Sequence, residues 1–145
     1  MQSFNKFAPK QVHFRMSKNP EKTKILTIDD NPDMLYLEKM VLEREGFEVI
    51  TAPNAAAALE MIPQLHDISL ILCDVQMENM DGIDFVKKLE ENYQDIFNVT
   101  PVVLVTALDS PPEAKVAGYI RKPSDLEEFA AKVKSFLLPQ ESTSV

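Results

Sequence analysis

Five short apolar runs constrain the fold of this chain more than any other feature of its sequence. Between the runs lie longer stretches whose apolar residues recur at helical spacing, and this alternation is typical of βα units that build a parallel sheet. Right-handed crossovers leave few topologies, of which the flavodoxin-like, doubly wound order 2-1-3-4-5 is favoured. The five expected strands are residues 24–28, 47–51, 69–73, 102–105 and 116–120.

Capping and breaking residues indicate where the helices begin and end. Asn31-Pro32 opens the first helix, because proline is tolerated in the first helical turn, and Gly46 is placed to end it. Asn54 is the expected N-cap of the second helix, which Pro63 stops. The sequence therefore predicts an α/β fold with helices between five strands. The remaining helices are expected around residues 83–89 and over 125–138.

The charge of the chain is unevenly distributed. Residues 1–24 hold six basic side chains and one acidic side chain, a net +5, and the whole chain carries −8, so the remainder carries −13. This acidic remainder argues against direct binding of nucleic acid. The basic leader, residues 1–23, is expected to be flexible or an addition to the natural chain, although it could contact an acidic partner or a membrane surface. Residues 24–138 are expected to form one folded domain and 139–145 a flexible tail.

Length and cysteine usage narrow the class of protein further. A chain of 145 residues can bury one substantial core. No apolar run approaches the ~18 residues that span a bilayer, and the leader lacks the apolar segment of a signal peptide. The one cysteine, Cys73, lies inside an apolar run and cannot form an internal disulfide. We therefore expect a cytoplasmic protein without a transmembrane segment.

Polar side chains follow four of the apolar runs at the point where each run ends. Asp29-Asp30 follows the first run, Asp74 the third, Thr106 the fourth and Lys122 the fifth. The carboxyl ends of parallel strands meet at one edge of the sheet, where ligands bind. Each residue alone has a plain structural explanation as a turn former, a cap or a strand residue. In combination, three carboxylates, a hydroxyl and a lysine can hold a divalent cation and a phosphoryl group.

The order and spacing of these residues resemble the receiver domain of bacterial response regulators over residues 24–138. The resemblance implies a Mg²⁺ site in which Asp30 and Asp74 are direct ligands and Asp29 acts through water. The backbone carbonyl of Gln76 completes the set by the same resemblance. The matching motifs are the acid pair, Asp74, the Met-x-x-Met-Asp-Gly segment Met77–Gly82, Thr106-Ala107 and Lys122-Pro123.

The same resemblance implies a role for each polar residue in phosphoryl transfer. Asp74 is the expected phosphoacceptor, supplied by a histidine kinase or a phosphotransfer protein. Lys122 would pair with one phosphoryl oxygen, and the Thr106 hydroxyl would donate to another. Tyr119 matches the aromatic residue that rotates inward when Thr106 moves, and the output is a changed affinity for a downstream protein. Pro123 matches a cis-proline position. The chain is not expected to be an enzyme beyond the phosphorylation and dephosphorylation of its own aspartate.

The main departure from the family lies between Thr106 and Lys122. Only fifteen residues intervene, which is fewer than receivers usually have. Ser110 and Glu113 have capping-box spacing, so we expect one or two helical turns, or an irregular loop, in place of the fourth helix. Such a change puts the usual partner and dimer surfaces in doubt. It also leaves apolar surface open for another element, such as the Phe-containing leader.

Three alternatives follow from the same residues. A receiver-like binding scaffold that does not use phosphorylation would keep the acidic pocket. A receiver fragment of a larger response regulator would have the same sequence. A magnesium-dependent phosphatase acting on small molecules usually has a second acid two residues past its nucleophile, and Gln76 stands at that position. The phosphatase is therefore disfavoured.

Overall fold

A computed structural model describes residues 23–122 and 125–138 of the chain. Its strands pair in parallel in the order β2-β1-β3-β4-β5, which confirms the predicted doubly wound topology. The strands are β1 (Lys24–Ile28), β2 (Glu48–Ala52), β3 (Ile68–Asp74), β4 (Val102–Thr106) and β5 (Gly118–Arg121). The helices are α2 (Pro32–Arg44), α3 (Ala55–Met61), the 3₁₀ turn η2 (Ile62–Gln64), α4 (Gly82–Asn92), α5 (Gln94–Val99) and α6 (Leu126–Leu137).

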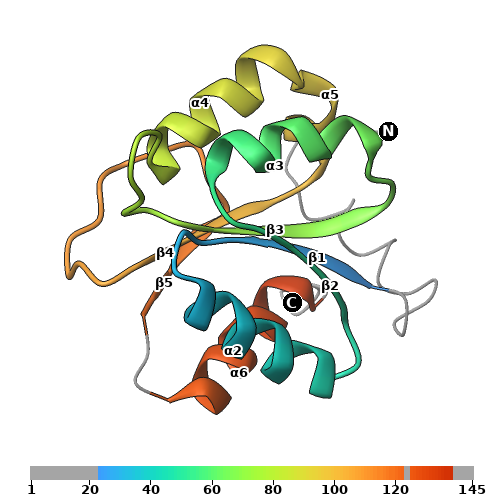
Figure 1. The fold of residues 1–145 in the computed structure, drawn as a ribbon, viewed down its shortest axis with the longest axis vertical. Helices are drawn as coiled ribbons and strands as arrows, with labels where there is room; N and C mark the ends of the chain where they lie inside the picture. The colour runs from blue at the N-terminus through green and yellow to red at the C-terminus, as the bar shows by residue number, and fades with distance from the viewer. Residues whose placement is uncertain (1–22, 123–124, 139–145) are drawn as a thin grey trace, which may run out of the picture.

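Helices cover both faces of the sheet. In Figure 1, α2 and α6 lie on one face and α3, α4 and α5 on the other. An apolar core fills each side: Leu42 and Phe129 belong to the core under α2 and α6, and Phe85 and Leu89 to the core under α3 and α4. All seven residues of the central strand β3 are buried, as expected for a strand covered on both faces.

The first helix begins and ends where its capping residues indicate. Asn31 Oδ1 accepts hydrogen bonds from the backbone N–H groups of Asp33 and Met34, and Pro32 is the first helical residue. Gly46 follows the helix with φ +99°, a conformation that costs glycine little because it has no Cβ. These contacts fix the turn that leads out of β1, which is where the acid pair lies.

Apart from the connection between β4 and β5, observed and expected elements differ chiefly in three places. The second α-helix, α3, ends at Met61, before Pro63 as expected, but the chain then continues as the 3₁₀ turn η2, since a proline is tolerated in the first turn of a helical segment. The helix α5 has no counterpart in the sequence prediction. It is six residues long and its N-cap, Tyr93, makes no side-chain cap, so the local signal is weak. Strand β5 begins two residues later than expected, at Gly118.

Residues 107–117, the β4–β5 loop, contain no helix. The irregular loop predicted as one alternative is therefore correct, and the helical turns suggested by Ser110 and Glu113 are wrong. The reason is local: Pro112 disfavours helical geometry in the residue before it, Pro111, which would be the first residue of the helix.

Contacts to the rest of the domain hold the β4–β5 loop in place. The Tyr119 hydroxyl donates a hydrogen bond of 2.7 Å to the Pro112 carbonyl. The Ala117 N–H donates to the Val102 carbonyl over 2.8 Å. Two exposed ion pairs join its charged side chains to neighbouring elements: Lys115 with Glu90, and Asp109 with Arg121.

Some expectations lie outside the described residues. These are the expectations for the leader except Thr23, for the tail 139–145 and for the Pro123 isomer. Within the described part of the chain, no helix is long and apolar enough to cross a membrane.

Candidate functional site

The predicted polar residues come together at the carboxyl-terminal edge of the sheet. Asp74 is the last residue of β3 and Thr106 the last of β4, while Asp29 follows β1 and Lys122 comes directly after β5. The parallel register keeps these strand ends level, since Asp74 pairs with Val105. Residues that are far apart in sequence therefore share one site, as the strand pattern predicted.

Asp29, Asp30 and Asp74 form an acid cluster in which ligand oxygens of the three carboxylates lie within 4.8 Å of one another. Asp29 and Asp74 are only 2% and 4% exposed, whereas Asp30 is exposed. Backbone N–H groups orient two of the carboxylates: Asn31 donates to Asp29 Oδ1 over 3.0 Å, and Glu78 donates to Asp30 Oδ2 over 3.1 Å. The acid cluster is therefore preformed by main-chain contacts.

Lys122 reaches into the acid cluster. Its Nζ lies 3.2 Å from Asp74 Oδ1 and 3.7 Å from Asp29 Oδ2. Burial alone would lower the pKa of Lys122, but the negative charges of Asp74 and Asp29 outweigh burial, and the pKa is raised. The ammonium group is therefore held in its charged form next to two buried carboxylates.

The charge state of Asp74 is finely balanced. Burial raises the pKa of Asp74 to about 6, and the nearby charge of Asp29 adds to the rise. The Lys122 ammonium and a hydrogen bond from the Gln76 backbone oppose it. Asp74 is thus mostly ionised at neutral pH and becomes protonated in mild acid.

The acid cluster fits a hard divalent cation. Within the described residues, the buried Asp74 Oδ1 has no hydrogen-bond partner, although the Lys122 ammonium lies 3.2 Å away. Three neighbouring carboxylates repel one another, and a bound cation would offset this repulsion. Carboxylate oxygens are the ligands that Mg²⁺ prefers in proteins. The residues that could hold the ion are therefore Asp29, Asp30 and Asp74.

Thr106 and Tyr119 occupy neighbouring strands and are held by different partners. Thr106 is buried, and its Oγ1 accepts a hydrogen bond of 3.0 Å from the Leu108 N–H. A hydroxyl that accepts one bond can still donate its own hydrogen to a ligand. Tyr119 is half-buried, and its hydroxyl donates to the Pro112 carbonyl. Both side chains are thus linked to the β4–β5 loop.

An open hollow of about 540 Å³ lies beside the acid cluster. Its lining combines acidic groups with apolar side chains of the β4–β5 loop, and the exposed Gln76 belongs to it. A small charged group can therefore reach the carboxylates from solvent. The lining includes Asp30, Glu78, Asp81, Met77, Leu108 and Pro112.

Gly82 explains part of the Met-x-x-Met-Asp-Gly segment. Its N–H donates to the Val75 carbonyl over 2.9 Å, which draws the start of α4 against the end of β3. A Cβ added at Gly82 would lie 2.6 Å from the backbone oxygen of Asp74, closer than real Cβ contacts. Only glycine allows this approach, so Gly82 contributes to the placement of Asp74.

Glu38 on α2 is a buried acid that the sequence prediction missed. Glu38 is 3% exposed, and Thr27 Oγ1 donates a hydrogen bond of 2.7 Å to its Oε1. Burial raises the pKa of Glu38 to about 7; the bond from Thr27 opposes the rise and the charge of Asp29 adds to it. A signal was present, because Glu38 has helical spacing with the buried residues Leu35 and Val41.

Fold and site together define a class of protein: a doubly wound parallel α/β domain with an acid cluster and a lysine at the carboxyl-terminal edge of its sheet. The family model of the response regulator receiver domain matches residues 25–134. The chain belongs to this family, the receiver domains of two-component response regulators.

Curated relatives are longer than this chain. The transcriptional regulatory protein CpxR of Escherichia coli K12 is 36% identical over 121 residues, which cover 79% of this chain and 49% of the relative. The transcriptional regulatory protein SrrA of Staphylococcus aureus is 35% identical over 127 residues, which cover 83% of this chain and 50% of SrrA. The chain thus spans about half the length of the curated relatives it matches.

Solved receiver structures resemble the whole fold. The chemotaxis protein CheY4 of Vibrio cholerae has a TM-score of 0.71 at 26% identity, and the match covers 79% of this chain and 98% of CheY4. The response regulator TrrA of Thermotoga maritima, solved in complex with Mg²⁺ and BeF, has a TM-score of 0.68 at 26% identity. This match covers 79% of this chain and 99% of TrrA.

Proposed function

We propose that this chain is a phosphoacceptor: Asp74 takes a phosphoryl group from a histidine kinase or a phosphotransfer protein, with Mg²⁺, and the domain then changes its affinity for a partner protein. The observation that carries the proposal is the geometry of one carboxylate. Asp74 lies in the acid cluster, 3.2 Å from the Lys122 ammonium, and is ionised at neutral pH. A buried, ionised carboxylate with a neighbouring cation is suited to nucleophilic attack on phosphorus.

The proposed transfer is a single displacement. A carboxylate oxygen of Asp74 forms a bond to phosphorus as the bond from phosphorus to the donor's imidazole nitrogen breaks, and the electron pair of that bond leaves with the imidazole. The product is an acyl phosphate on Asp74. Catalysis of such a step is mostly positioning and stabilisation of charge. Lys122 pairs with one phosphoryl oxygen, and the Thr106 hydroxyl donates to another.

The acid cluster would hold the metal ion through Asp30, Asp74 and the backbone carbonyl of Gln76, with Asp29 acting through water. When bound, Mg²⁺ supplies neutralisation of phosphoryl charge. The closeness of the three carboxylates, and the mutual repulsion that a cation would offset, support this assignment.

Phosphorylation would be read out through Thr106 and Tyr119. Thr106 reaches the β4–β5 loop through Leu108, and Tyr119 reaches it through Pro112. A phosphoryl group that draws the Thr106 hydroxyl toward it would disturb the hydrogen bond to Leu108 and, through the β4–β5 loop, the hydrogen bond between Tyr119 and Pro112. The output would be a change in the surface near β5 for a protein partner, with residues 24–138 as the signalling domain. The activity of the longer relatives as transcriptional regulators belongs to those proteins.

Phosphorylation by a small donor tests the proposal. The protein is incubated with acetyl phosphate and Mg²⁺, and the intact mass is recorded for the wild type, for Asp74→Asn and for Asp95→Asn, an exposed aspartate on α5. We expect one phosphoryl adduct on the wild type and on Asp95→Asn, none on Asp74→Asn, and none when Mg²⁺ is chelated.

A binding scaffold that does not use phosphorylation gives a different result. It would form no adduct, and beryllofluoride with Mg²⁺ would leave its amide spectrum unchanged. Absence of the adduct with a clear beryllofluoride response would instead indicate rapid hydrolysis of the acyl phosphate.

A further inference from the structure

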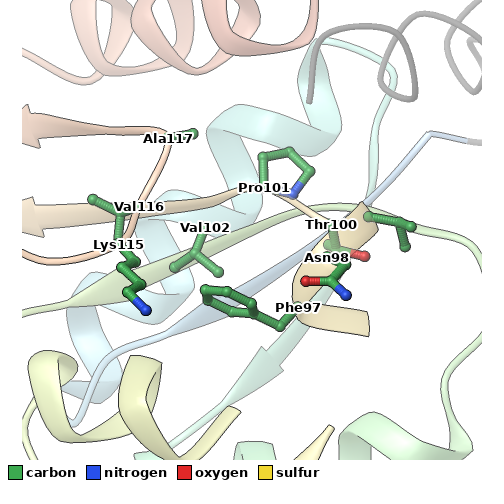
Figure 2. A pocket seen from close by; sticks show the side chains of 9 residues that line it. Phe97, Asn98, Thr100, Pro101, Val102, Lys115, Val116 and Ala117 are labelled. Carbon is green, nitrogen blue, oxygen red and sulfur yellow. The ribbon is translucent and has the colours of Figure 1, made fainter. Parts of the chain in front are cut away.

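An apolar groove lies at the edge of the sheet opposite the acid cluster. Its volume is about 220 Å³, and side chains of α5, of the start of β4 and of the end of the β4–β5 loop surround it, as Figure 2 shows. For comparison, a buried cavity of ~150 Å³ is large enough to bind benzene. The groove therefore has room for an aromatic ring. Its apolar lining consists of Phe97, Val99, Pro101, Val102, Val116 and Ala117.

The groove exists because the β4–β5 loop has no helix. A helix in this connection would be expected to cover the sheet beside α5, since α/β folds bury both faces of their sheet. The loop instead passes in an irregular course, and its end leaves Val116 half-buried and Ala117 exposed. Val99 at the end of α5 is 39% exposed. Apolar side chains thus line an open surface that another element can cover.

The groove lies within reach of the leader, residues 1–22. The described chain begins at Thr23, directly before β1, and the parallel register places Leu26 of β1 level with Ile71 of β3 and Ile71 level with Val102 of β4. Strands are ~4.8 Å apart and an extended chain advances ~3.3 Å per residue, so only a few residues separate Thr23 from the groove.

The leader has apolar side chains that could fill the groove and basic side chains that could approach the acidic domain. It carries four large apolar side chains, Phe4, Phe7, Val12 and Phe14, among five basic residues and one acidic residue. The chain from residue 25 onward carries −13. Asp95 is exposed on α5, the helix whose last residues line the groove, and the charge of Lys115 in the lining is paired with Glu90. Apolar surface can therefore be buried while opposite charges approach one another.

We propose that the leader docks into this groove of its own chain and covers the surface that a helix between β4 and β5 would cover. An aromatic side chain of the leader fills the groove beside Phe97 and Val116, and its lysines face α4 and α5. This docking is independent of phosphoryl transfer, because the groove lies at the opposite edge of the sheet from Asp74.

A spin label on the leader tests the docking in the full-length chain. Gln11→Cys provides the labelling site, because the one native cysteine, Cys73, is fully buried. We expect paramagnetic broadening of the amide signals of residues 97–102 and 114–118, and no broadening at the acid cluster. A leader that does not dock would broaden the amides around its attachment at Thr23 without preference for the groove, and this result or broadening confined to another face would overturn the proposal.

Two further samples separate the possible occupants. Val99→Lys places a charge of the same sign as that of the leader at an exposed position of the groove and should abolish the broadening there, while Tyr36→Lys, on the exposed side of α2, should leave it unchanged. Contacts between molecules are detected in a mixture of two samples: protein that carries the spin label but no NMR isotopes, and protein that carries the isotopes but no spin label. Groove broadening in this mixture as strong as in the single sample would mean that a second copy supplies the leader, and would overturn docking within one chain.

Discussion

The Thr27 hydroxyl on β1 donates a hydrogen bond of 2.7 Å to the carboxyl group of Glu38 on α2. Glu38 is only 3% exposed, so this hydrogen bond is made inside the domain. Burial raises the pKa of Glu38 from 4.5 to about 7. The folded protein therefore binds a proton at Glu38 more tightly than the unfolded chain does. It follows that the contribution of Glu38 to stability is fully present below about pH 4.5 and is lost as the pH rises toward 7.

Glu38→Gln should stabilise the protein in alkaline solution. Glutamine can accept the hydrogen bond from Thr27 and carries no charge to bury, so we expect a gain of about 3 kcal/mol or less at pH 8 and little change at pH 5. Chemical denaturation at both pH values measures the difference. Glu60→Gln, at an exposed position of α3, is the matched control. An equal effect of Glu38→Gln at both pH values would contradict the assignment of a raised pKa.

Mg²⁺ affinity should fall in mild acid. The pKa of Asp74 is raised to about 6, chiefly by burial, and a metal ligand must be deprotonated. Below this pH we expect the affinity to weaken by up to about tenfold per pH unit, measured by calorimetric titration. Asp74→Asn should bind Mg²⁺ weakly throughout, and affinity that stays constant between pH 7.5 and pH 5 would exclude Asp74 as a ligand. Repeating the titration with Glu38→Gln removes the other carboxyl group of the described residues whose pKa is raised toward neutrality.

Gly82→Ala should weaken both the fold and the metal site. The added Cβ would lie 2.6 Å from the Asp74 carbonyl oxygen and 2.9 Å from Val75 Cα, so the strand end must shift. We expect a loss of about 1–3 kcal/mol in the free energy of unfolding and a weaker affinity for Mg²⁺. Gly118→Ala is the control, because its Cβ would meet the ring of Phe136 instead. It should lose stability without a change in Mg²⁺ affinity.

Tyr119→Phe should loosen the β4–β5 loop. The substitution removes the hydrogen bond of 2.7 Å to the Pro112 carbonyl and keeps the ring. The expected cost is about 1 kcal/mol, with faster amide hydrogen exchange in residues 107–116. Tyr36→Phe, at an exposed position of α2, controls for loss of a hydroxyl. Unchanged exchange in the loop would mean that the Pro112 contact does not hold it.

Much of the fold could be predicted because its signals are local. Asn31 and Gly46 bound the first helix as expected, and the observed strands begin and end within two residues of the predicted runs. The exceptions are segments whose local signal is weak or mixed. The helix α5 lacks a side-chain cap, and the capping-box spacing of Ser110 and Glu113 conflicts with the two prolines between them.

Which residues stand at the ends of the strands follows from the order of residues alone, because strand period and chain connectivity are properties of that order. The same order of residues places Asp29, Asp74 and Lys122 at one edge of the sheet. Their assigned roles in phosphoryl transfer stay predictions.

How these groups affect one another depends instead on the packing of the folded domain. Burial of Asp74, its distance of 3.2 Å from Lys122 and the approach of Gly82 to its backbone join segments that are not adjacent in sequence. The same holds for the bond between Thr27 and Glu38. Desolvation and Coulomb interaction depend on what surrounds a group in space, and for that reason the pKa values and the open groove follow from packing and not from any local pattern.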